Sequence, residues 1–350
     1  MKNIKIKYLL PFFAMAFVLL GVFSSCNSED SANGGGSGSP AITSVALSEA
    51  GDLVPVTVGD PKNYYIIRGT GLSTVSKIYF NDFDTYFNPV LVTDTAIFVL
   101  IDEKTPYADA SNKLKVVTKR GTILYDFVVA PPTPRLGSYN PINAEEGDIV
   151  TIYGDYFLDP VVKVGTETVS VVSSTLKEIK FKMPADAKDK YVTVTNISGS
   201  TVSKVAIGSA LYDDVSYYGL TFPSWNNQTY PVDGTAAQGL VYIKSKMGVW
   251  GSLQGDWSWF DKLDSYGGIR VTIKAAIPGA VKFCFNGNWD DATSPVLNVT
   301  TEWKTFEIPW SALTTSDRVQ NITFQNITKN SNGDGLENTF SIDDIGLFLK

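Results

Sequence analysis

Seven tryptophans, all between Trp225 and Trp310, are the residues whose type and spacing point most directly to chemistry in this 350-residue chain. Trp250, Trp257 and Trp259 fall within ten residues of one another. Because Trp257 and Trp259 are two positions apart, they would share one face of a β-strand. An indole is a wide, flat apolar surface that can cover the C–H face of a pyranose, while nearby polar groups bond the hydroxyls. The cluster predicts a sugar-binding surface.

Amide side chains accompany two more of these indoles. Trp289 follows Asn286 in the loop-like run Asn-Gly-Asn, and Trp225 is followed by Asn-Asn-Gln. The predicted glycan-contacting residues are Trp257, Trp259, Trp289, Trp250, Trp225, Asn286 and, on a candidate strand, Gln325. Each indole could instead pack in a core, which is the expectation for Trp303 and Trp310 because they lie on or beside an apolar strand.

The overall charge excludes several kinds of partner. Lys and Arg number 29 against 36 Asp and Glu, a net charge of −7, and histidine is absent. Nucleic acid is not an expected partner, because Lys and Arg supply most of that affinity. A strongly acidic polysaccharide is disfavoured by the same sign of charge. Without histidine, catalytic triads and zinc sites built on imidazole are impossible.

An enzyme that cleaves glycans remains an alternative to a binding protein. Glycoside hydrolysis normally requires two carboxylates flanking the bond. Beyond residue 209 the glutamates are Glu302, Glu307 and Glu337, and the E-x-D-x-x-E pattern of jelly-roll glucanases is absent. An aspartate pair such as Asp290 and Asp291 keeps a surface endo-glycanase open. The favoured interpretation is a non-catalytic binding protein.

The elements that must position these residues are predicted to be β-strands. Short apolar or alternating runs such as residues 64–67, 96–101 and 114–117 recur along the chain, bounded by Gly, Pro, Asn, Asp and Ser. No long segment keeps a helical period. Many short strands separated by turn signals predict an all-β fold built of sandwiches.

The first half of the chain contains an internal repeat. Residues 65–72, with Gly69 and Leu72, correspond to residues 150–157, with Gly154 and Phe157. A hydrophobic strand, a glycine and then a core aliphatic or aromatic residue resemble the immunoglobulin-like IPT/TIG domain. The resemblance implies two Ig-like sandwiches, residues 41–130 and 131–208, that serve as spacers. The glycine is expected to permit an unusual backbone turn, and the residue after it to fill the core.

Residues 209–350 resemble jelly-roll carbohydrate-binding modules. The resemblance is carried by Leu-Tyr-Asp-Asp at 211–214, Val-Trp-Gly-Ser-Leu at 249–253, the strand of residues 301–309 and the closing Ser-Ile-Asp-Asp-Ile at 341–345. It implies a jelly-roll β-sandwich that forms the glycan-binding domain. Arg270 and Lys274, on candidate strand faces, are expected to be solvated.

Related modules often bind a structural Ca²⁺ through oxygen ligands where the first and last strands meet. In this chain the corresponding carboxylates are Asp213, Asp214, Asp343 and Asp344. They are the predicted ligands of a structural calcium ion. The alternative is an exposed acidic edge that discourages pairing with other strands.

The N-terminus reads as a targeting segment. Lys2, Lys5 and Lys7 precede an apolar stretch, residues 8–23, that is short for a membrane span. Its end, Phe-Ser-Ser-Cys26, resembles the lipobox of bacterial lipoproteins, which implies a signal peptide over residues 1–25 and a lipid on Cys26. A plain signal peptide is the alternative. Residues 26–40 are polar and glycine-rich, so a flexible tether is expected there.

The whole set resembles the surface glycan-binding lipoproteins of starch-utilisation-type (polysaccharide utilisation) systems. That resemblance implies a lipid-anchored protein of the outer membrane, facing the cell exterior, which captures polysaccharide for a TonB-dependent transporter and surface glycosidases. A neutral β-glucan is the favoured ligand, because an extended chain with apolar faces suits a row of indoles. Xyloglucan and mannan fit nearly as well, and a protein-binding adhesin is a further alternative.

Overall fold

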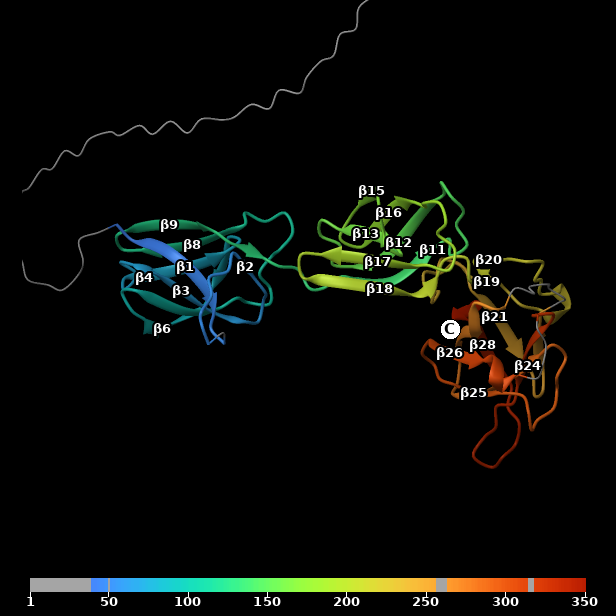
Figure 1. Cartoon of the computed structure of the whole chain (residues 1–350). Helices are drawn as coiled ribbons and strands as arrows, with labels where there is room; N and C mark the ends of the chain where they lie inside the picture. The colour runs from blue at the N-terminus through green and yellow to red at the C-terminus, as the bar shows by residue number, and fades with distance from the viewer. Residues whose placement is uncertain (1–38, 50, 256–262, 314–317) are drawn as a thin grey trace, which may run out of the picture.

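The computed structural model describes residues 39–49, 51–255, 263–313 and 318–350. Over these residues the regular structure is almost entirely β-strand, interrupted by the short 3₁₀ helices η1 (Ser224–Asn226) and η2 (Trp310–Ala312). The predicted all-β class is confirmed. Figure 1 shows three strand-built domains following one another in a row, with the N-terminal and C-terminal domains at opposite ends. Along the described residues, no helix has the length and apolar character needed to cross a membrane.

The N-terminal domain is a sandwich of the sheets β1-β3-β7-β6 and β5-β4-β8-β9, with β2 and β10 paired in parallel beside them. Alternation along the strands decides which side chains are buried: on β3, Tyr65 and Ile67 are buried, whereas Tyr64 is exposed. Its strands are β1 (Ala41–Leu47), β2 (Val58–Gly59), β3 (Tyr64–Thr70), β4 (Val75–Phe80), β5 (Phe83–Thr85), β6 (Phe87–Val92), β7 (Ala96–Leu100), β8 (Lys113–Thr118), β9 (Gly121–Asp126) and β10 (Val128–Val129).

The middle domain repeats this arrangement. Its sheets β11-β12-β16-β15 and β14-β13-β17-β18 have the same strand order as their counterparts in the N-terminal domain. The repeat seen in the sequence is therefore a repeat of topology. Its strands are β11 (Arg135–Asn140), β12 (Ile149–Asp155), β13 (Val161–Val164), β14 (Glu167–Val169), β15 (Val171–Ser174), β16 (Glu178–Lys182), β17 (Tyr191–Asn196) and β18 (Gly199–Ala206).

Gly69 and Gly154 occupy equivalent places near the ends of β3 and β12. The reason that glycine is required there differs from the one expected. A Cβ on Gly69 would lie 2.0 Å from the carbonyl oxygen of Ala41, and one on Gly154 would lie 1.9 Å from that of Arg135. Close backbone approach, rather than an unusual turn, therefore excludes a side chain. The core-filling role is confirmed, since Leu72 and Phe157 in the two copies are 0 % and 2 % exposed.

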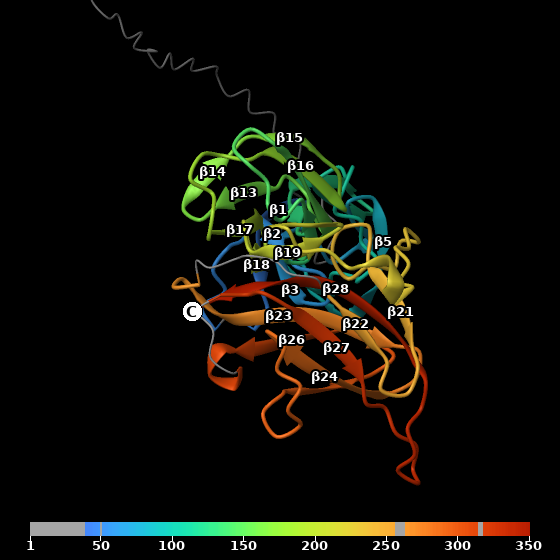
Figure 2. The ribbon, with the colours of Figure 1, turned by 90° about the vertical axis from the view of Figure 1, so that its right-hand side faces the viewer.

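The C-terminal domain is a jelly-roll sandwich of two sheets whose inner faces enclose one apolar core (Figure 2). One sheet has the order β20-β19-β28-β23-β26, with β21 also on β28, and the other has the order β22-β27-β24-β25. The strands are β19 (Ala210–Asp213), β20 (Val215–Ser216), β21 (Ile243–Met247), β22 (Ser252–Gln254), β23 (Tyr266–Ala275), β24 (Gly279–Phe285), β25 (Val296–Val299), β26 (Lys304–Pro309), β27 (Ile322–Asn326) and β28 (Asn338–Leu349).

Candidate functional site

The sheet β22-β27-β24-β25 has one face in the core and an opposite, outer face. Leu253 and Phe324 belong to the core, so their strand neighbours Ser252 and Gln325 point the other way. Gln325 is paired with Ser252 on one side and with Lys282 on the other. These three polar residues therefore form a row across the outer face, which is bordered by loops that carry tryptophans.

Trp250 lies immediately before β22 and is 54 % exposed. The side-chain Nε2 of Gln325 donates a hydrogen bond of 3.2 Å to the backbone carbonyl of Trp250. The backbone of Trp250 has a φ of 62°, in the left-handed region that favours glycine. Holding a bulky residue there costs about 1–3 kcal/mol, and such strain concentrates at functional sites. An exposed indole kept in a strained conformation points to a role outside folding.

Trp289 lies in the loop after β24 and is 42 % exposed. Beneath this loop, the buried Lys282 donates from Nζ to the carbonyl of Trp289 at 3.0 Å and forms an ion pair of 2.5 Å with Asp291. The loops of Trp250 and Trp289 are thus both held through backbone carbonyls, and their indoles take no part in that anchoring.

Trp225, on η1, is the third exposed indole, at 60 %. The neighbouring Asn226 fixes η1 to the last residue of β22, because its Nδ2 donates to the carbonyl of Gln254 at 3.0 Å and its Oδ1 accepts from the N–H of Gln254 at 3.1 Å. Trp225 therefore lies next to the C-terminal end of β22, and Trp250 lies just before its N-terminal end.

The other predicted contacts have different positions. The side-chain amide of Asn286 forms hydrogen bonds with the backbone of a neighbouring loop. Its Oδ1 accepts from the N–H of Gln320 at 2.7 Å, and its Nδ2 donates to the carbonyl of Arg318 at 2.7 Å. Asn286 thus helps to position the loop that carries Trp289. Trp257 and Trp259 lie outside the described residues, in the segment that follows β22, and their contacts stay predictions.

Trp303 does not lie in the core, contrary to expectation. It is partly exposed just before β26, on the opposite sheet. Its Nε1 donates to the carbonyl of Thr235 at 2.7 Å, and its ring forms a T-shaped pair with Tyr242. The ammonium of Lys274 lies 4.6 Å from the centre of the same ring. An indole N–H needs a polar partner, which favours this rim position. Trp310 packs against the core as predicted.

The aspartates predicted as calcium ligands do converge where β19 pairs with β28, but protein groups already bond to them. Asp213 accepts from the N–H of Ile142 at 3.0 Å. Asp214 accepts from the N–H groups of Leu240 and Val241, both at 2.6 Å. These oxygens therefore accept hydrogen bonds from backbone N–H groups instead of being left free to coordinate a cation.

The other two carboxylates are also bonded to protein groups. Asp343 accepts from the N–H groups of Ala237 and Gln238 at 2.8 and 3.0 Å. Asp344 pairs with Arg270, whose Nη2 lies 2.8 Å from Oδ1, and both side chains are less than a tenth exposed. Arg270, expected to be solvated, is buried. Among the residues that the structure describes, no group of three or more acidic, histidine or cysteine side chains is arranged to hold a metal. Protein groups use most oxygens of the predicted set, but the buried Oδ1 of Asp213 accepts no hydrogen bond from the described residues, and the calcium ion stays a prediction.

These buried groups join the middle domain to the C-terminal domain. Asp214 accepts a hydrogen bond from the side chain of Asn140, and the amide of Asn143 makes two bonds of 2.9 Å with the backbone of Ala210. The hydroxyl of Tyr266 donates to Asp189 at 2.7 Å. The two domains therefore share a buried polar interface rather than a free linker.

Burial in this interface should make stability depend on pH. It raises the pKa of Asp213 to about 8 and that of Asp343 to about 7. In the unfolded chain the pKa of an aspartate is about 3.9. Between that pH and about 8 the folded state therefore binds more protons than the unfolded state, and the free energy of unfolding falls as pH rises through this range. We expect the free energy of unfolding, obtained from urea titrations, to decrease between pH 5.5 and 8.5 by at most about 1.4 kcal/mol per pH unit for each group. Asp213→Asn should flatten this dependence, and an unchanged slope in that variant would contradict it.

Sequence reasoning missed Lys282 and Arg270 as positioning residues. Lys282 carries a signal that could have been noticed, because it is the lone charge inside the apolar run Val281–Phe285. A cation in such a run is rarely buried without a partner. No comparable local signal marks Arg270, whose partner Asp344 is 74 residues away.

Comparison with known proteins agrees with this architecture. Residues 134–212 match the IPT/TIG domain family. The surface glycan-binding protein PbSGBP-B from Prevotella bryantii aligns over 89 % of this chain and 99 % of its own, at 19 % identity and a TM-score of 0.51. SGBP-B from a complex xyloglucan utilization locus in Bacteroides uniformis aligns over 89 % and 99 %, at 15 % identity and a TM-score of 0.35.

Among curated protein sequences, none matches the chain significantly. The likeness to the Prevotella protein extends over nearly the full length of both chains and shows a common fold. The chain is thus an all-β protein with the fold of a surface glycan-binding protein, and its middle domain matches the IPT/TIG family.

Proposed function

We propose that this protein captures a neutral polysaccharide at the cell surface without cleaving it. The observation that carries the proposal is that three exposed indoles, Trp225, Trp250 and Trp289, belong to segments held by strands of one sheet. The favoured ligand is a β-glucan, because the apolar faces of an extended chain can lie against successive flat rings. The fold shared with a surface glycan-binding protein supports the same class of ligand.

The polar row supplies the hydrogen-bonding part of such a site. The amide oxygen of Gln325 is buried and takes no hydrogen bond from the described residues. A buried acceptor without a partner costs about 1–3 kcal/mol, and a sugar hydroxyl would relieve that cost if the side chain of Gln325 turned outward on binding. Hydroxyls that merely exchange water for protein partners add little, and the affinity of one site should be modest.

The arrangement of nearby carboxylates favours binding over hydrolysis. Asp291 is paired with Lys282, and Asp290 accepts from the N–H of Ala292 at 2.8 Å. Both groups therefore stabilise the loop of Trp289 instead of standing as a free acid and nucleophile, which glycoside hydrolysis would need.

A panel of neutral polysaccharides tests the proposal. Affinity electrophoresis of the full chain in gels containing β-glucan, xyloglucan or mannan should show retardation by at least one of them. The same mixtures should release no reducing sugar. Retardation by none of the three would refute glycan capture, and release of reducing sugar would establish the endo-glycanase alternative.

The same proposal places the protein on the outer membrane, with Cys26 lipidated and residues 26–40 as the tether. The Ig-like domains, at 41–130 and 131–208, would raise the glycan-binding domain, at 209–350, toward a TonB-dependent transporter and surface glycosidases. Several acyl chains on one cysteine would anchor it stably.

Cys26→Ala should release the protein from the membrane fraction, because no other position is proposed to carry lipid. The measurement is immunoblotting of membrane and soluble fractions, with Cys284→Ala as the control, since Cys284 is buried in the C-terminal domain. Retention of the Cys26 variant on membranes would rule out this anchor.

A further inference from the structure

The outward face of one N-terminal sheet carries an aromatic pair that lies outside the core of its domain. On β3 and β7 the residues Tyr65 and Val99 are buried in the core, so Tyr64 and Phe98, one position away, face outward. Their rings are stacked, with centroids 4.8 Å apart and planes 15° from parallel. Tyr64 remains 46 % exposed. The pair is an apolar surface presented to the outside.

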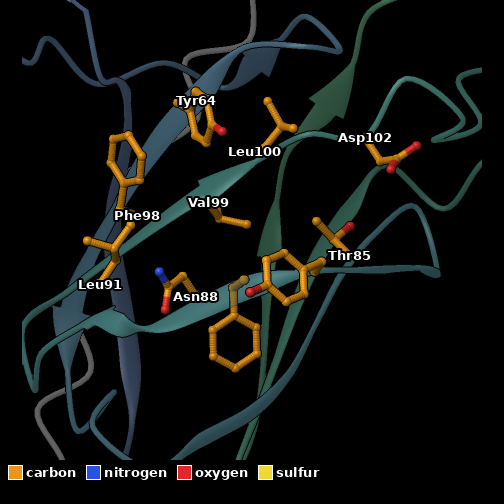
Figure 3. Close-up of a pocket in the computed structure, with 10 residues that line it drawn as sticks. Tyr64, Thr85, Asn88, Leu91, Phe98, Val99, Leu100 and Asp102 are labelled. Carbon is orange, nitrogen blue, oxygen red and sulfur yellow. The ribbon is translucent and has the colours of Figure 1, made fainter.

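This pair forms one wall of a cavity of about 370 Å³ (Figure 3). The opposite side comes from β6 and the residue before it, where Tyr86 is 82 % exposed. The edge strand β6 adds Asn88, and the loop after β7 adds Asp102. A cavity of this size lies within the range of small-ligand sites, about 300–1,000 Å³.

Both polar residues keep hydrogen-bonding capacity. Asn88 uses its amide oxygen to accept from the N–H of Val90 at 3.1 Å, and Asp102 uses Oδ1 to accept from the N–H of Lys104 at 2.8 Å. Neither the amide nitrogen of Asn88 nor Oδ2 of Asp102 is bonded to another of the described residues. The cavity thus combines aromatic faces with an amide donor and a carboxylate acceptor.

We propose that this cavity is a second glycan site, which takes one or two pyranose units of the same neutral polysaccharide. This inference rests on the proposed function for the class of ligand. A protein partner fits less well, because a stable protein interface buries about 800 Å² on each partner, whereas this site is a small, mixed apolar and polar hollow. The two sites lie in the domains at opposite ends of the row (Figure 1), so a long chain could engage both.

Engaging both sites would raise retention on a polymer more than binding to a short oligosaccharide. The second binding step becomes intramolecular, and linkage of two weak sites can raise overall affinity by about 10²–10⁴. The double variant Tyr64→Ala/Tyr86→Ala should therefore reduce retention in polysaccharide gels by at least about tenfold. Tyr79→Ala, an outward tyrosine on the other sheet of the same domain, should leave retention unchanged.

Hydrogen–deuterium exchange of the full chain locates the site directly. The probes are cellohexaose, mannohexaose and a xylogluco-oligosaccharide, each at millimolar concentration. At least one should slow exchange over residues 64–70 and 85–102, and Tyr64→Ala/Tyr86→Ala should abolish this protection. Protection there should persist in Trp250→Ala/Trp289→Ala, which removes indoles only from the C-terminal domain.

The outcomes separate the two proposals. Protection confined to the C-terminal domain would overturn the second site and leave the proposed function intact. Protection of neither domain, together with no retardation by any polysaccharide, would overturn both. Protection over residues 85–102 that survives in the double tyrosine variant would show that Tyr64 and Tyr86 do not hold the ligand, and it would refute the assignment.

Discussion

Trp250→Ala and Trp289→Ala should each abolish detectable retardation by the polysaccharide while leaving the melting temperature nearly unchanged. Exposed aromatic anchors are the residues whose truncation costs binding most, about 2 kcal/mol or more. That loss is roughly thirtyfold in affinity, which is enough to remove the signal of a modest site. Stability should persist because Gln325 and Lys282 hold these loops through backbone carbonyls. Binding isotherms and melting curves of each variant provide the measurement.

Trp303→Ala is the matched control for this prediction. It removes an indole of the same domain, but from the opposite sheet, where the ring contacts Tyr242 and Lys274. Binding should be unaffected, and stability should fall less than the 3–5 kcal/mol typical of a buried tryptophan, since Trp303 is partly exposed. Loss of binding in this variant, with normal binding by both others, would move the site to the other sheet.

Trp250→Gly adds a sharper test at the strained position. Glycine adopts a φ of 62° without the penalty that a side chain incurs, so this variant should be more stable than Trp250→Ala by about 1 kcal/mol. It should bind no better than the alanine variant. Such a gain in stability with loss of binding would identify the indole as retained for function. Equal stability of the two variants would mean that the backbone relaxes.

Arg270→Met should destabilise the protein by about 3–5 kcal/mol, the largest stability change we expect. It leaves the buried Asp344 without its charge partner, and an uncompensated buried charge is far more costly than the pair it replaces. Arg270 also donates to the hydroxyl of Ser209 at 3.0 Å and to the carbonyl of Leu347, so it braces the start and the end of the C-terminal domain. Urea unfolding followed by tryptophan fluorescence reports this domain, because all seven tryptophans follow residue 224.

The double variant Arg270→Met/Asp344→Asn separates charge from packing. Replacing the carboxylate by an amide removes the unpaired charge, so a substantial part of the lost stability should return. Lys246→Met, which breaks an exposed ion pair with Glu337, should change stability by less than about 1 kcal/mol. If Arg270→Met were as mild as this control, the buried ion pair would not support the interface.

Local pattern was sufficient to predict the fold class. Strand alternation and turn residues specify which side chains can be buried, as in β17, where Val192 and Val194 are buried between half-exposed neighbours. The glycine-plus-apolar phrase likewise indicated the IPT/TIG domain. Composition predicts the type of the site, because indoles grouped with amides suit the apolar faces and hydroxyls of sugars, and this assignment stays a prediction.

What the sequence by itself determined is therefore the all-β class, the repeated Ig-like topology and the concentration of indoles in the last domain. Only the tertiary structure decided that the segments of Trp225, Trp250 and Trp289 are held by one sheet and that Trp303 lies on the other. It also showed that Asp213 and Asp344 bind Ile142 and Arg270. The physical reason is range: alternation and turn chemistry act over a few neighbouring residues, whereas strand register and domain docking join groups about 70 positions apart.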